Sequence, residues 1–270
     1  MQYLVVRLVF GLVCSIIIGT PVALCGPQKA LKLSPKTRIE KIDDDKSFVL
    51  LQDIKPFLKD IYIVTKDQYA KAPAIVDSLN DTAIFTAGSK AITKGLKESD
   101  TSRYMIAREG VLRRHPISKE ALGIEFEVLG NGRNVLSAHG SAFHILNTQG
   151  DIILGAKLFP FEELKLPAKI HVGRPAQKLE GYILSGADNF TARARGLGDT
   201  VTISLGKRDN IQVGNLLTIY KEPYKKASKK DKTLLAVGQI LIYRIFDKVS
   251  VGLITSAETG VYEFDKVFSE

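Results

Sequence analysis

Short segments of two-residue periodicity, separated by glycine, asparagine and aspartate, run through most of this chain and constrain its fold more than any other feature. Alternation of apolar and polar residues is the pattern of a half-buried β-strand, and the intervening residue types favour turns. The sequence therefore predicts an all-β chain of small sandwiches or barrels. The clearest strand candidates are Thr82–Phe85, Ile124–Val128, Thr200–Ser204, Leu216–Tyr220 and Gln239–Ile245.

The length and composition fit two folded domains rather than a disordered chain. The 270 residues are 45% hydrophobic, and at roughly 150 residues per domain the chain is long enough for about two domains. Lysine and arginine number 38 against 29 acidic residues, a formal net charge of +9. This charge favours an anionic neighbour, and nucleic acid, a cell-wall polymer and phospholipid headgroups all meet that description.

Comparison of the two halves predicts that one β module occurs twice. We expect a first module over residues 73–165 and a second over residues 176–270, joined by a proline-marked linker and preceded by a connector over residues 26–72. Three landmarks recur in the same order. Asp81–Lys90 matches Asp199–Arg208 at an offset of 118, Leu122–Phe126 matches Val237–Leu241 at 115, and Gly150–Ile153 matches Phe264–Val267 at 114.

Two local expectations concern the connector and a turn. Helical spacing over Leu50–Leu58 predicts one short helix, which Pro56 limits to about two turns. In the turn from Gly206 to Gly214 we expect both glycines to adopt positive φ, with Ile211 and Val213 packed beneath.

The N-terminus has the features of an export leader over residues 1–25. One positive charge precedes the apolar run Leu8–Gly19, the length of a secretory signal core. Cys25 is a candidate lipidation site, although Leu24 stands where lipoprotein cleavage boxes have a small residue. Ordinary cleavage near Ala23 to Gly26 and an uncleaved anchor are the alternatives. The chain's two cysteines, Cys14 and Cys25, both lie in this leader, and export would place the protein in the periplasm or envelope, or on the outer membrane as a lipoprotein.

Several short collinear motifs carry a family resemblance over roughly residues 31–269. They are Leu33–Glu40, Ile54–Leu58, Ala72–Val76, Leu122–Glu125 and Leu205–Gly214. Together they resemble the long C-terminal region of LysM-domain-containing, peptidoglycan-binding envelope proteins of Gram-negative bacteria. The resemblance implies an envelope location and a region with no established catalytic role. The LysM module itself is missing, because only about seven residues separate the leader from Leu33, so glycan binding transfers to no residue.

The chain lacks the motifs of the common catalytic and metal sites. Its four histidines, His115, His139, His144 and His171, have no zinc-site spacing. Ser204 and Lys207 have the Ser-x-x-Lys spacing of penicillin-recognising enzymes, but Ser204 would end a strand rather than begin a helix. We expect a protein that is not an enzyme and that holds no cofactor or metal.

The strongest basic feature is the segment Lys221–Lys232, which carries six lysines and two acidic residues. We interpret it as a solvated hairpin tip, with contact to anionic headgroups or peptidoglycan carboxylates as the functional alternative. Nucleic-acid binding is not expected, since Tyr224 is the single aromatic residue among the lysines. The candidate contact residues are Lys221, Lys225, Lys226, Lys229, Lys230 and Lys232.

These observations predict an exported, non-catalytic envelope protein that acts as a scaffold or interaction platform. Its expected partners are peptidoglycan or envelope proteins, and the membrane surface if a lipid anchor or the lysine segment reaches it. Direct peptidoglycan binding is one alternative, and an accessory subunit of an envelope-spanning secretion or motility machine is another.

Overall fold

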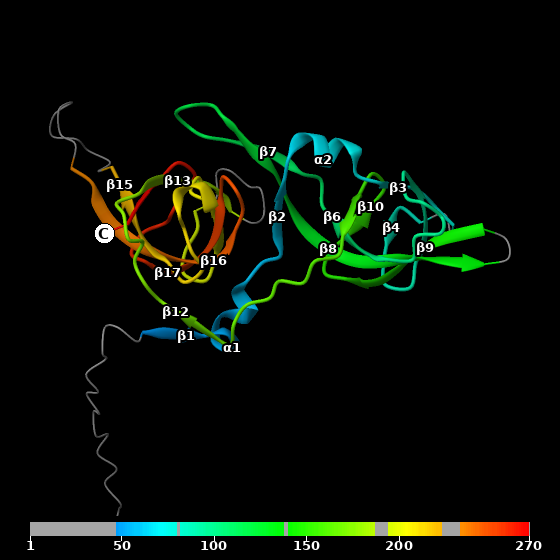
Figure 1. Ribbon diagram of the computed structural model, residues 1–270, viewed down its shortest axis with the longest axis horizontal. Helices are drawn as coiled ribbons and strands as arrows, with labels where there is room; N and C mark the ends of the chain where they lie inside the picture. The colour runs from blue at the N-terminus through cyan, green and yellow to red at the C-terminus, as the bar shows by residue number, and fades with distance from the viewer. Residues whose placement is uncertain (1–46, 80–81, 138–139, 187–193, 223–232, 270) are drawn as a thin grey trace, which may run out of the picture. The chain divides into compact units, whose positions relative to one another are not determined.

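The computed structural model describes residues 47–79, 82–137, 140–186, 194–222 and 233–269 (Figure 1). Residues Ile42–Glu270 form one compact unit. The predicted leader and Cys25 lie outside the described residues. As predicted, the described chain is mainly β-structure, and its strands close into two successive six-stranded barrels.

The first barrel closes around a core that includes Phe85, Ile106, Phe143 and Leu158. All its strand pairs are antiparallel, and the ring closes where the second half of the long strand β8 pairs with β9. In order around the ring, its strands are β3 (Ala74–Ser78), β5 (Lys90–Lys94), β9 (Gly140–Thr148), β8 (Ala121–Ser137), β6 (Arg103–Ala107) and β11 (Lys157–Pro160).

The second barrel encloses a core of branched aliphatic side chains such as Val201, Ile219, Ile240 and Val267. It begins at β13 and ends at β18, next to the C-terminus. Around the ring its strands are β13 (Glu180–Gly186), β14 (Thr200–Ile203), β17 (Ser250–Ala257), β16 (Leu235–Ile245), β15 (Leu216–Lys221) and β18 (Lys266–Phe268).

The two barrels share one connectivity, which supports the predicted duplication. Counted in chain order within each barrel, the strands follow one another around the ring as 1-2-5-4-3-6 in both. The β-bulges coincide as well. The pairs β6–β8 and β15–β16 are bulged at equivalent residues, and so are the pairs β8–β9 and β16–β17. Bulges at matching places make an accidental likeness of two unrelated barrels improbable.

The register of the repeat differs from the one predicted. Gly88 and Gly198 both have positive φ, and both donate to the matching strand, to Ile145 O at 2.8 Å and Ile254 O at 2.9 Å. These glycines stand 110 positions apart, where the sequence comparison gave 118. Likewise the bulges of β8–β9 and β16–β17 follow Asn131 and Gln239, which are 108 positions apart, where the sequence comparison gave 115. The predicted offsets exceed the observed ones by eight and by seven positions, so the short sequence landmarks matched segments of similar composition that do not occupy equivalent positions in the two barrels.

The remaining elements connect or extend the barrels. The 3-10 turn η2 contains Pro56 and continues from α1, as the proline predicted, whereas α2 was not predicted although Thr65 caps it in a capping box. β2 and β7 flank the first half of β8, β1 pairs with β12, and β4 pairs with β10. Their bounds are β1 (Phe48–Leu50), α1 (Leu51–Ile54), η2 (Lys55–Phe57), β2 (Ile61–Val64), α2 (Lys66–Lys71), β4 (Ile84–Phe85), β7 (Val111–Arg114), β10 (Ile152–Ile153), β12 (Lys169–His171) and the 3-10 turn η3 (Lys207–Asp209).

The turn that follows β14 differs in part from its prediction. Gly214 has φ of +91°, but Gly206 has φ of −140°, and the left-handed position between them is taken by Asn210 at +58°. Asparagine tolerates this region better than most residues. Ile211 is buried as expected, whereas Val213 is 39% exposed.

Candidate functional site

The structure describes only one of the lysines predicted to contact an anionic surface. Lys221 ends β15, and its ammonium donates to the carbonyl oxygen of Gly260. The same Nζ lies 3.5 Å from an Asp265 carboxylate oxygen and 4.4 Å from the ring centroid of Tyr262. Its charge is therefore engaged within the second barrel. The other five candidates, Lys225, Lys226, Lys229, Lys230 and Lys232, lie outside the described residues.

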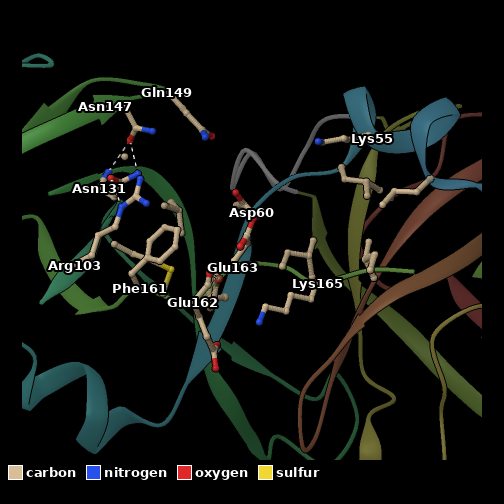
Figure 2. Close-up of a pocket in the computed structure, with 18 residues that line it drawn as sticks. Lys55, Asp60, Arg103, Asn131, Asn147, Gln149, Phe161, Glu162, Glu163 and Lys165 are labelled. Atoms are coloured by element: carbon tan, nitrogen blue, oxygen red, sulfur yellow. Dashed lines mark hydrogen bonds between the residues drawn. The ribbon is translucent and has the colours of Figure 1, made fainter. Parts of the chain in front are cut away.

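A cleft of about 710 Å³ opens against the outer face of β6, β8 and β9. Its lining comes from three parts of the sequence: the connector between Leu51 and Tyr62, the first barrel, and the segment Phe161–Leu166. Figure 2 shows Arg103, Asn131, Asn147 and Gln149 on one side of the cleft, with Lys55 and Lys165 on the opposite side.

The barrel wall of the cleft is a hydrogen-bonded set of polar side chains. Arg103 Nε donates to Asn131 Oδ1 at 2.8 Å, and Asn131 Nδ2 donates to Asn147 Oδ1 at 2.6 Å. The Arg103 guanidinium also lies 4.2 Å from the centroid of the Phe161 ring. Asn131 is only 6% exposed. These contacts fix a row of amide and guanidinium groups, which can recognise amides, hydroxyls and carboxylates.

Tyr62 supports the opposite side of the cleft. Its hydroxyl donates to the carbonyl oxygen of Glu162 at 2.5 Å, and the Arg244 guanidinium carbon lies 3.5 Å from its ring centroid. Burial raises the pKa of the Tyr62 hydroxyl, and Arg244 opposes that rise. Arg244 is 8% exposed, its Nη1 has no hydrogen-bond partner, and that atom lies 4.0 Å from the cleft-lining carboxylate of Asp60.

Sequence reasoning missed this cleft. Arg103, Asn131 and Phe161 lie in separate segments that fit no known motif, and only the pairing of β6 with β8 brings the first two together. A weak signal did exist, because the polar residues Asn131, Arg133 and Asn134 closely follow the apolar pair Val128 and Leu129.

His115 and Ser204 both accept hydrogen bonds from the backbone. His115 Nδ1 accepts from the backbone of Ser118 at 3.2 Å, and Ser204 Oγ accepts from the backbone of Tyr182 at 2.9 Å. His139 lies outside the described residues. Within the described ranges, no three His, Cys, Asp or Glu side chains are grouped as a metal site would require. The helices in those ranges are too short or too polar to cross a membrane.

The chain matches no protein-family model and no curated protein sequence.

Proposed function

We propose that the protein is an exported, non-catalytic component of the bacterial envelope that acts as an interaction platform. The observation that carries the proposal is the composition of the cleft beside the first barrel. Its described lining supplies guanidinium, amide, ammonium, carboxylate and aromatic groups, but no serine, threonine, cysteine or histidine. A row of fixed hydrogen-bonding groups favours binding, and the described lining offers none of the serine, threonine, cysteine or histidine nucleophiles of covalent catalysis. The leader and the family resemblance support the location.

Packing between the barrels and the connector supports the role of a platform. Tyr243 of the second barrel is fully buried and donates to Lys59 O of the connector at 2.9 Å. Glu120, between β7 and β8, accepts from Lys248 at 2.7 Å and Arg208 at 3.0 Å, both from the second barrel. A unit joined by such contacts can present binding surfaces at fixed separations.

In vivo cross-linking tests this proposal. Cells that produce the protein are treated with a short cross-linker, and the adducts are identified by mass spectrometry. We expect envelope proteins in stoichiometric adducts, and one dominant partner would indicate an accessory subunit of a larger machine. Recovery of cytoplasmic proteins alone would contradict the proposal. Palmitate labelling of the wild type and of Cys25→Ala tests the anchor, and a label that survives the substitution would refute attachment at Cys25.

Direct binding to peptidoglycan is the second candidate. The cleft favours it because Asn131, Asn147 and Gln149 offer amides beside the Phe161 ring, a combination suited to amide-bearing glycans and peptides. Residues 29–270 are incubated with purified sacculi at low and high salt and then centrifuged. Pelleting that persists at high salt would support the candidate, and protein that stays in the supernatant at both salt concentrations would eliminate it.

A further inference from the structure

Four basic side chains form one row across the outer surface of the first barrel. Arg103 on β6 pairs directly across the strands with Arg133 on β8. Arg133 in turn pairs with His144 on β9, and His144 pairs with Lys90 on β5. Direct partners point to the same face of a sheet. Arg103, Arg133 and Lys90 are exposed and His144 is half-buried, whereas the alternating neighbours Phe143 and Ala91 are buried in the barrel. We call these four residues the cationic row.

The row carries a repulsion between like charges that no ion pair among the described residues offsets. Like charges placed directly opposite one another destabilise a sheet. Among the described residues, Lys90, Arg103 and Arg133 form no ion pair. The pKa of His144 is lowered, first by burial and then by the charges of Lys90 and Arg133. A bound anion would relieve this repulsion, and the Arg103 end of the row already lines the cleft.

The second barrel shows what the same face does in the duplicate. The equivalent positions are Leu216, Leu241, Leu253 and Thr200, which pair in the same succession on β15, β16, β17 and β14. That face is covered, because Leu241 and Leu253 pack in one cluster with Ile54 of α1 and Ile170 of β12. Thr200 Oγ1 also donates to the carbonyl oxygen of Phe57 at 3.2 Å. In the second barrel this face therefore receives polypeptide segments from the connector and from the linker at β12, mainly through apolar contacts.

We propose that the cationic row of the first barrel binds an acidic, extended polypeptide segment of a partner protein. The duplicate indicates the kind of occupant, a peptide. The first barrel has two arginines, a histidine and a lysine where the second has three leucines and a threonine, and this difference sets the charge of the occupant. Neighbouring strands lie about 4.8 Å apart, so the row spans about 14 Å at the backbone, a little more than four residues of extended chain. This inference rests on the proposed function of an interaction platform and specifies one class of partner.

The shape of the row favours a peptide over a membrane. The row crosses four of the six strands of a closed barrel, so it is convex. A flexible chain can follow a convex surface, whereas a flat bilayer cannot contact both ends of it together. The forked guanidinium groups of Arg103 and Arg133 also suit the planar carboxylates of aspartate and glutamate.

The test uses fluorescein-labelled decaglutamate as the probe and fluorescence anisotropy as the readout, with residues 29–270 in low salt. The double variant Lys90→Gln/Arg133→Gln is compared with Arg114→Gln/Lys178→Gln, which changes the net charge equally at exposed positions away from the row. At about two- to fivefold for each exposed charge pair, we expect the row variant to bind about tenfold more weakly and the control to bind like the wild type. The charge reversal Lys90→Glu/Arg133→Glu should bind labelled decalysine more tightly than the wild type does.

Three results would overturn the inference. Equal affinity of the row and control variants would show that the probe responds to net charge alone. Stronger binding to anionic phospholipid vesicles or to polyphosphate than to decaglutamate, lost in the row variant, would assign the row to those anions instead. If cross-linking in cells captures the same partner with the row variant as with the wild type, the platform function stands and the row is not its docking site.

Discussion

Substitution of one member of the buried ion pair between Arg113 and Glu125 should strongly lower the free energy of unfolding. Arg113 Nη2 lies 3.2 Å from Glu125 Oε1, Nε donates to Oε2 at 3.3 Å, and the two side chains are 6% and 3% exposed. At an effective dielectric constant of 20, charges at this distance attract by about 5 kcal/mol. Removal of their solvation opposes most of that attraction, so the intact pair is near neutral in net stability.

Removal of Arg113 alone takes this cation away from the buried carboxylate of Glu125. The charges of this pair also act on Glu263. Burial raises the pKa of the Glu263 carboxyl, the positive charge of Arg113 lowers it, and the negative charge of Glu125 raises it. In Arg113→Leu the two carboxylates would repel each other without the intervening cation. We therefore expect Arg113→Leu to reduce the free energy of unfolding by about 3–5 kcal/mol at neutral pH. The double variant Arg113→Leu/Glu125→Leu should recover most of that loss.

Urea unfolding followed by circular dichroism measures these changes at pH 7.5 and pH 4.5. The adjacent variant Arg114→Leu is the matched control, because Arg114 lies on the same strand but is exposed, and it should shift stability by about 0.5 kcal/mol or less. The Arg113→Leu penalty should shrink at pH 4.5, because Glu263, whose pKa is raised by burial, takes up a proton there and no longer repels Glu125. Equal losses for the two arginines, or a penalty independent of pH, would refute the electrostatic reasoning and leave a simple packing defect.

Three further predictions concern other contacts. Tyr243→Phe removes the hydroxyl that donates to Lys59 O. It should lower the free energy of unfolding in urea by about 1–2 kcal/mol. An unchanged unfolding midpoint would show that water replaces the hydroxyl. Gly214→Ala should lower the melting temperature far more than Gly88→Ala: both glycines have positive φ, but only at Gly214 would a Cβ collide with the His171 carbonyl oxygen. The hydrogen bonds from Lys248 and Arg208 lower the pKa of Glu120. Its stabilisation is thus present above the unfolded-state pKa of about 4.3 and is lost as pH falls through the lower folded-state value. Glu120→Gln should destabilise the protein at pH 7 and have little effect at pH 2.5, and an equal effect at both would contradict the ion-pair interpretation.

Local sequence patterns predicted the strands well, because a half-buried strand needs only alternation and turn residues at its ends. Thr200–Ser204, Leu216–Tyr220 and Gln239–Ile245 fall on β14, β15 and β16. The duplication was also visible in sequence, but its register was not. Register depends on which residues pair across the barrel, and the shared bulges that establish it leave no mark in a period-two pattern.

The candidate sites needed the tertiary structure. Arg103, Asn131 and Phe161 come together because β6 pairs with β8 and the chain after β11 returns past them. Lys90, Arg133 and His144 are scattered basic residues in sequence, and only closure of the barrel aligns them in one row.

The sequence by itself determined an all-β chain, an internal duplication, a candidate leader and an excess of positive charge. Each is a property of composition or of short-range periodicity, which the order of residues records directly. Only the tertiary structure decided which basic residues become neighbours. The same barrel face is apolar and covered by the connector in one copy, and cationic and exposed in the other, because its residues become neighbours through strand pairing rather than through sequence proximity.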